Sequence, residues 1–185
     1  MSHTATQRHR WSREEYDRMI AAGVFHPEAR LELIEGEIIN KTPQGSLHAT
    51  AVQLATELLK KAFSSQFAIR VQLPLALEDS SEPEPDLAVV IGSPRDYRDA
   101  HPTAAVLIVE IADSTLTFDR QQKKKLYART GIEDYWIINL IDQQVEIYRN
   151  PKNEDYLQNT TLTPGQSITP LASSGTPINI TDMLP

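Results

Sequence analysis

Two apolar segments and one charged segment decide the expected fold: PDLAVVI at residues 85–91, AVLIVEIA at residues 105–112 and DRQQKKKLY at residues 119–127. The first two are nearly continuous apolar runs with many β-branched residues, which is typical of buried strands. The third is short and amphipathic, which indicates a helix. We therefore expect two buried strands, followed by a helix that packs near them.

Each of the two expected strands carries one carboxylate, Asp86 or Glu110. A charge in or beside a buried strand costs free energy unless a partner compensates it, and two neighbouring carboxylates also repel each other. A divalent cation resolves both problems, and Lys123 on the following helix supplies a positive group. The residues thus predict a magnesium-dependent phosphodiesterase centre with Asp86 and Glu110 as metal ligands.

Each of these residues also has an ordinary structural explanation. Asp86, which follows Pro85, could cap a turn at a strand entry. Glu110 could form a salt bridge with an arginine, because a buried glutamate is rarely unpaired. The lysines at positions 123–125 could form a solvated helix face. These alternatives stay open from the sequence alone.

Spacing on the expected helix favours a role for Lys123. Asp119, Lys123 and Tyr127 are four residues apart and share one face. If that face points towards strand 105–112, the lysine can reach the carboxylates. His48, at the start of an earlier helix, is expected to be a capping or core residue, or else a ligand or general base.

The rest of the chain predicts one α/β domain with a central mixed sheet flanked by helices. Residues 1–10 are expected to be a disordered tail, and residues 11–185 to form the single domain. Helices are expected over residues 13–22, 47–63 and 119–130. Strands are expected in a hairpin at 31–39, over the alternating run 66–77, over 85–91 and 105–112, in a hairpin at 134–149, and at 156–162.

Composition narrows the possible classes of protein. The chain has 185 residues, a formal net charge of -7 and no cysteine, so disulfides and thiolate chemistry are excluded. The negative charge argues against a protein that coats nucleic acid, although a local basic patch and a metal can still hold such a substrate. Because the N-terminus has no apolar segment and no run could span a bilayer, we expect a cytoplasmic protein with no membrane contact.

Several motifs together resemble the Uma-type endonuclease family, a group labelled as a domain of unknown function. The resemblance covers roughly residues 11–149. It is carried by RLELIEGEII at 30–39, His48, Pro85-Asp86, VEIADS at 109–114, the spacing of Asp119, Lys123 and Tyr127, and GIEDYWII at 131–138.

This resemblance implies a restriction-endonuclease-like fold of the PD-(D/E)XK superfamily, with a Mg²⁺ or Mn²⁺ site for phosphodiester hydrolysis. Asp86 would correspond to the strand aspartate, and Glu110 to the acidic residue of the E-x-K motif. Ala112 occupies the position of the motif lysine, whose role would pass to Lys123. Glu32 is similar to an additional acidic position, which would act on the metal through water.

These residues would form an endonuclease acting on nucleic acid, with DNA as the expected substrate. Lys123 would orient water or stabilise charge at phosphorus. The alternative is a catalytically inactive nucleic-acid-binding or protein-interaction module on the same scaffold. A homodimer is a further expectation, with the hairpin 134–149 as an exposed pairing surface. Backbone contacts to nucleic acid are expected from Arg70, Arg120, Lys124, Lys125 and Arg129.

Overall fold

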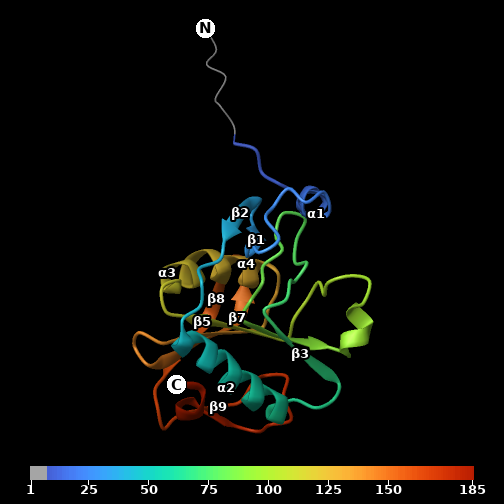
Figure 1. Ribbon diagram of the computed structural model, residues 1–185. Coiled ribbons are helices and arrows are strands. Elements are labelled where there is room, and N and C mark those ends of the chain that lie inside the picture. Colours follow the sequence, from blue (N-terminus) through green and yellow to red (C-terminus); the bar gives the residue numbers. More distant parts are fainter. Residues whose placement is uncertain (1–7) are drawn as a thin grey trace.

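The computed structural model describes residues 8–185, and its centre is a six-stranded sheet (Figure 1). The strands follow the order β3-β4-β5-β6-β7-β8, with β5 and β6 parallel and every other neighbouring pair antiparallel. The expected mixed central sheet is therefore present. The strands are β3 (Phe67–Val71), β4 (Leu87–Ile91), β5 (Leu107–Ala112), β6 (Asp134–Asn139), β7 (Gln144–Lys152) and β8 (Asp155–Leu162).

Helical layers cover both faces of this sheet. On one face lie α2 (Ser46–Ala62) and the C-terminal segment with β9 (Ser167–Ile168), β10 (Ile178–Asn179) and η3 (Ile180–Met183). On the other face lies a continuous helical stretch made of α3 (Leu116–Phe118), the π-helical turn η2 (Asp119–Lys123) and α4 (Lys124–Arg129). Figure 1 shows these two layers below and above the sheet.

An N-terminal subassembly sits beyond the second layer. It consists of α1 (Arg13–Ala21) and the hairpin of β1 (Leu31–Ile34) and β2 (Glu37–Asn40). Ser12 caps α1 through the capping box that its sequence predicts. A 3-10 turn, η1 (Pro94–Tyr97), lies in the connection between β4 and β5.

The period-two alternation of β5 determines where Glu110 points. Leu107, Val109 and Ile111 pack into the core on the α2 side, whereas Ile108 and Ala112 pack on the α4 side. Side chains of a strand alternate between its two faces, so Glu110 shares the α4 face. The sequence pattern thus delivers a buried carboxylate towards the helix that carries the lysine.

Two expectations about strands were wrong. The run 66–77 does not continue as one strand, because β3 ends at Val71 and Gln72 takes a positive φ of 52°. The hairpin 134–149 is not an exposed surface, because β6 lies between β5 and β7 and every one of its residues is buried. β8 instead forms the outer edge on that side.

Residues 1–7 of the expected N-terminal tail lie outside the described residues. Residues 8–10 have no helix or strand, and Arg10 contacts the β1–β2 hairpin through the Glu35 carbonyl and Glu37. Within residues 8–185, no helix has the length and apolarity needed to cross a membrane.

Candidate active site

Asp86 and Glu110 face each other across two adjacent strands. Leu87 pairs with Val109 in the antiparallel ladder, and continuing that register by one residue sets Asp86 opposite Glu110. The Asp86 amide donates to Glu110 Oε2 at 3.3 Å, and the Ile111 amide donates to Asp86 Oδ2 at 2.9 Å. Each carboxylate is thereby held by the backbone of the strand opposite.

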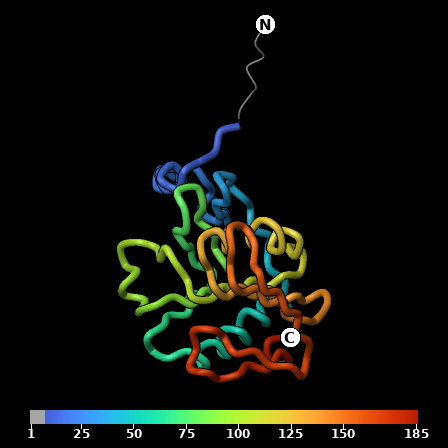
Figure 2. The backbone as a smooth tube through the Cα atoms, turned by 180° about the vertical axis from the view of Figure 1, so that it is seen from behind, coloured from blue at the N-terminus to red at the C-terminus, as the bar shows by residue number. Residues whose placement is uncertain are grey.

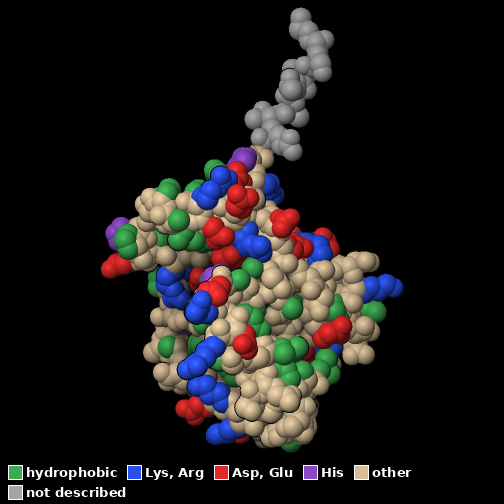
Figure 3. Space-filling model, turned by 90° about the vertical axis from the view of Figure 1, so that its right-hand side faces the viewer, with side chains coloured by type: hydrophobic (Ala, Val, Ile, Leu, Met, Phe, Trp, Pro, Cys, Tyr) green, Lys and Arg blue, Asp and Glu red, His purple; other side chains and the backbone are tan. Residues whose placement is uncertain are grey.

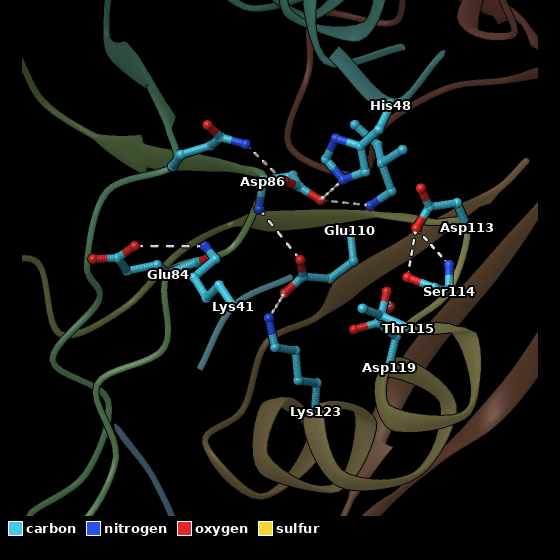
Figure 4. A network of polar contacts seen from close by, with 12 residues as sticks. Lys41, His48, Glu84, Asp86, Glu110, Asp113, Ser114, Thr115, Asp119 and Lys123 are labelled. Atoms are coloured by element: carbon cyan, nitrogen blue, oxygen red, sulfur yellow. Dashed lines mark hydrogen bonds and ion pairs between the residues drawn. The ribbon is translucent and has the colours of Figure 1, made fainter. Parts of the chain in front are cut away.

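Lys123 reaches this pair from the helix above the sheet. Its Nζ lies 3.0 Å from Glu110 Oε1 (Figure 4). It also lies 3.2 Å from Oε2 of Glu32, which comes from β1. The Tyr127 hydroxyl donates to Glu110 Oε1 at 2.7 Å. The partners of Glu110 are therefore a lysine, a tyrosine and a backbone amide, and the alternative of an arginine salt bridge is wrong.

The π-helical turn positions the charged side chains of this helix. The amide of Lys124 donates to the carbonyl of Asp119, five residues earlier, and that carbonyl also accepts the Tyr135 hydroxyl at 3.1 Å. Asp119 and Lys123 both point inward and are buried. Short π-turns inside α-helices occur frequently at functional sites, which fits the placement of this one.

His48 and Gln72 hold Asp86 from the other side. His48 Nε2 lies 3.2 Å from Asp86 Oδ2, and Gln72 Nε2 donates to Asp86 Oδ1 at 3.0 Å. Burial by itself lowers the pKa of His48, but the hydrogen bond and charge of Asp86 outweigh it and raise the pKa. Burial by itself raises the pKa of Asp86. The contacts with His48 and Gln72 outweigh burial and bring the pKa below its ordinary value, so this carboxylate stays ionised.

The cluster as a whole is acidic and poorly hydrated. Glu32, Asp86, Glu110 and Asp119 are all at least nine-tenths buried, against one buried lysine. Burial raises the pKa of Glu110 to about 7 and that of Asp119 to about 6, although Lys123 opposes both shifts. Buried like charges disfavour ionisation, so this cluster would attract a further cation.

A cavity of about 270 Å³ opens directly over these side chains. Its walls include the carboxylates, Lys123 and residues of the loop from β2 to α2. The seven residues that the sequence singled out are Glu32, His48, Asp86, Glu110, Asp119, Lys123 and Tyr127; all except Tyr127 line this cavity, and Tyr127 contacts it through Glu110.

The family model described as "Uma2: Putative restriction endonuclease" matches residues 13–180. The chain belongs to the Uma2 family. Among solved structures, the Uma2 chain is similar to a crystal structure described as a "putative nuclease belonging to DUF820" from Anabaena variabilis. The identity is 20%, the TM-score is 0.71, and the match covers 94% of this chain and 97% of that one. No curated protein matches.

The structural similarity shows that this Uma2 protein has the restriction-endonuclease-like fold that its motifs implied. The six-stranded mixed sheet with helices on both faces is the observed form of that fold. The strand that carries Glu110 lies in its middle, and Ala112, at the position of the motif lysine, is fully buried. Lys123 supplies the ammonium group from the next helix instead.

Lys41 is a cavity residue of the Uma2 chain that the sequence did not reveal. It lies just after β2, and its Nζ donates to the Glu84 carbonyl at 2.6 Å and lies 3.5 Å from Glu84 Oε2. The amide of Glu84 in turn donates to Glu32 Oε2. Lys41 is thus linked to the buried cluster through Glu84, and it contributes a second ammonium group to the cavity wall. A single lysine after a hairpin carries no local signal of this role.

Five basic residues were expected to contact a nucleic-acid backbone, and four of them make contacts within the Uma2 chain instead. Arg129 binds Glu35, Glu78 and Glu154, and Arg120 binds Glu146. Lys124 pairs with Asp155. Arg70 donates to the Pro74 carbonyl and lies over the Tyr97 ring. Only Lys125, within residues 8–185, is an exposed candidate without an ion pair.

The donor set of this Uma2 site suits a hard divalent cation. Within the part of the chain that the structure describes, no three His, Asp or Glu side chains lie close enough to hold a metal by themselves. Asp86 and Glu110 each accept three polar contacts, and a carboxylate has about four lone-pair sites. Mg²⁺ typically uses one or two carboxylates and fills its remaining positions with water and phosphate oxygens. Two opposed carboxylates beside an open cavity therefore fit the ion.

Proposed function

We propose that this protein is a divalent-metal-dependent nuclease that hydrolyses phosphodiester bonds of nucleic acid, with DNA as the substrate. The observation that carries the proposal is the convergence of three groups at one cavity. Asp86 and Glu110 lie opposite each other on one face of the sheet, and Lys123 contacts Glu110 at 3.0 Å. Family membership and the restriction-endonuclease-like fold support it.

Asp86 and Glu110 would hold Mg²⁺ or Mn²⁺ directly, and Glu32 would contribute through water. Such an ion, when bound, polarises a phosphate oxygen and lowers the pKa of a bound water. His48 and Gln72 fix the orientation of the Asp86 carboxylate. The raised pKa of Glu110 also fits this role, because a cation would compensate the charge that burial disfavours.

Lys123 would stabilise the negative charge that develops on the phosphate during the reaction. Its contacts to Glu32 and Glu110 raise its pKa well above the ordinary value despite complete burial, so the side chain stays protonated. A fixed positive group of this kind needs no reorganisation when charge develops. Tyr127 and Asp119 come from the same helical stretch as Lys123. Tyr127 would orient Glu110 through its hydroxyl group, and the charge of Asp119 helps to keep Lys123 protonated.

Substrate binding would depend more on the metal and the cavity than on an extended basic surface. Acidic and basic side chains are intermixed over the upper half of the face in Figure 3, and most of the expected basic contacts are ion-paired. Lys41 lies on the cavity wall, and its ammonium group, which is paired with Glu84, would add positive charge near a bound phosphate.

Three features favour a second candidate function. Most of the expected basic residues are ion-paired, the net charge is -7, and Ala112 stands at the position of the motif lysine. In that case the protein is an inactive nucleic-acid-binding or protein-interaction module that keeps the nuclease scaffold. The two candidates differ in whether a cation turns binding into cleavage.

A cleavage assay over a Mg²⁺ and Mn²⁺ titration separates them. Supercoiled plasmid, linear duplex, single-stranded DNA and RNA are incubated with the wild type, with Asp86→Ala and with Asp99→Ala as a matched control. Asp99 is a surface carboxylate paired with Arg98 and remote from the cavity residues. Metal-dependent cleavage that is lost only in Asp86→Ala supports the nuclease. Salt-sensitive binding without cleavage at any metal concentration supports the inactive module.

A further inference from the structure

The three groups of the proposed site are recessed. Asp86, Glu110 and Lys123 are only 7%, 3% and 4% exposed, and the cavity over them has a volume of about 270 Å³. Pockets that enclose a drug-sized molecule usually measure about 300–1,000 Å³, so this one has room for a single small unit such as one nucleotide. A phosphate must enter the cavity to reach these side chains.

A base-paired duplex fits such a recess poorly. The major groove of B-DNA alone is about 12 Å wide, whereas a cube with the volume of this cavity has an edge of only about 6 Å. Turning one nucleotide out of a duplex also costs the free energy of unpairing and unstacking, which a single strand largely avoids. A flexible single strand can therefore place one nucleotide in the recess more easily.

An aromatic side chain forms part of the cavity wall. Phe118, the last residue of α3, is half-buried and packs against the core on the α4 side, and it lines the cavity together with Ile39 of β2. In the view from behind, the helical stretch that carries Phe118, in yellow, lies just below the β1–β2 hairpin, in blue (Figure 2). A phosphate has no apolar surface for such a ring, whereas unpaired bases stack on aromatic side chains.

Two side-chain amides on the same wall are free to bind a base edge. Asn40 and Gln44 line the cavity, and within residues 8–185 neither side chain makes a hydrogen bond. Each amide offers donors and an acceptor, as the Watson–Crick edge of a base does. In a duplex the partner base occupies that edge, and only an unpaired base presents it to a protein.

The charges around the cavity also favour a contact that needs no cation. The lysines of its wall, Lys41 and Lys123, are both paired with carboxylates. Binding to duplex DNA depends strongly on Lys and Arg side chains that neutralise several phosphates. Stacking of bases on an aromatic side chain contributes affinity without this charge.

We propose that the cavity takes one unpaired nucleotide, with its base against Phe118, and that the substrate is therefore single-stranded rather than duplex DNA. Asn40 and Gln44 bind the edge of the same base. This inference rests on the proposed function, because it assumes that a phosphodiester group is what Asp86, Glu110 and Lys123 receive.

One DNA sequence offered in three forms tests the substrate class: a single strand, a blunt-ended duplex, and a duplex with a single-stranded gap. Cleavage is measured with Mg²⁺, and binding is measured by fluorescence anisotropy with Ca²⁺ in its place. We expect the single strand and the gap to be cleaved, and the single strand to be bound, at least about 10-fold better than the duplex, which must first lose pairing and stacking.

Phe118→Ala tests the contact with the base. One stacked base contributes a factor of about 5 to 150 in affinity, so this variant should bind the single strand more weakly by such a factor, with unchanged affinity for Mn²⁺. Phe118→Leu, which keeps the apolar packing without the ring, should also bind it more weakly, and Phe118→Tyr should bind like the wild type. Phe25→Ala is the matched control, because Phe25 is also half-buried but does not line this cavity.

The outcomes separate this inference from the proposed function. Cleavage and binding of the duplex as good as those of the single strand would overturn the inference and leave the nuclease in place. Single-strand affinity of Phe118→Ala and Phe118→Leu equal to that of the wild type would do the same. Preferential binding of the single strand without cleavage at any metal concentration would support the cavity assignment and overturn the nuclease.

Discussion

The backbone amide of Asp86 holds the side chain of Glu110, with 3.3 Å between the amide nitrogen and Oε2. This bond does not use the Asp86 side chain. Changing Asp86 to asparagine therefore removes a charge without releasing Glu110. We expect Asp86→Asn to stay folded and to lose metal-dependent cleavage by at least about 100-fold, since changes outside the metal ligands already cost about 10–100-fold. Cleavage rates at saturating Mg²⁺, with circular dichroism for the fold, measure this.

Asp99→Asn is the matched control for that variant, because it changes an exposed carboxylate in the same way. It should cleave like the wild type. Equal rates for Asp86→Asn and the wild type would remove Asp86 from the reaction.

Lys123 is expected to contribute to stability as well as to chemistry. It is fully enclosed between Glu110 and Glu32, and replacing it with methionine leaves two buried carboxylates without their cation. Removing one partner of a buried ion pair typically costs about 3–5 kcal/mol. Urea unfolding of Lys123→Met should show a loss of this size. The neighbouring Lys125→Met changes an exposed side chain and should stay within about 0.5 kcal/mol of the wild type; similar losses in both variants would contradict the buried contact.

Tyr127→Phe isolates one hydrogen bond to Glu110. The hydroxyl donates to Oε1 at 2.7 Å from a fully buried ring. A hydrogen bond to a charged group contributes about 1.5–3 kcal/mol, so we expect a loss of free energy of unfolding in that range. Cleavage should fall less than in Asp86→Asn, because Lys123 still contacts Glu110. A variant as stable as the wild type at every pH would show that the hydroxyl does not stabilise this carboxylate.

Glu82 gives a pH dependence that is separate from the site. Burial raises the pKa of Glu82 to about 7, although Arg13 opposes the shift. The unfolded chain ionises first as pH rises, so stability is full below pH 4.5 and falls as pH rises through about 7. With allowance for solvent screening, Glu82→Gln should be more stable than the wild type by about 1–2 kcal/mol at pH 8 and equal to it near pH 4.5.

Glu57→Gln is the control for that series, because Glu57 lies on the exposed face of α2. Its free energy of unfolding should be close to that of the wild type at both pH values. If Glu82→Gln is no more stable than the wild type at pH 8, the fold does not disfavour the ionised carboxylate.

The placement of Asp86, Glu110 and Lys123 could be predicted because local patterns determine it. A continuous apolar strand fixes which face carries Glu110, and four-residue spacing fixes the inward face of the helix. Both patterns act over a few residues, and the structure brings the three groups to one cavity as expected. What these groups do chemically remains a proposal.

Long-range pairing and backbone irregularities could not be predicted in the same way. Arg129 contacts Glu78 and Glu35 at separations of 51 and 94 residues, so its sequence position suggested a free cation. Gln72 leaves the strand with a positive φ inside an alternating run, and its side chain donates to Asp86. No local propensity marks a glutamine for that conformation.

The central claim is that Asp86 and Glu110 share one divalent cation beneath the cavity. Anomalous diffraction from crystals soaked in Mn²⁺ tests it most directly. We predict one Mn²⁺ per chain that is bound by a carboxylate oxygen of each residue at about 2.0–2.3 Å, with Lys123 still beside Glu110. Mn²⁺ bound only elsewhere, or no bound Mn²⁺ while Asp86 keeps His48 and Glu110 keeps its amide and lysine partners, would contradict the account.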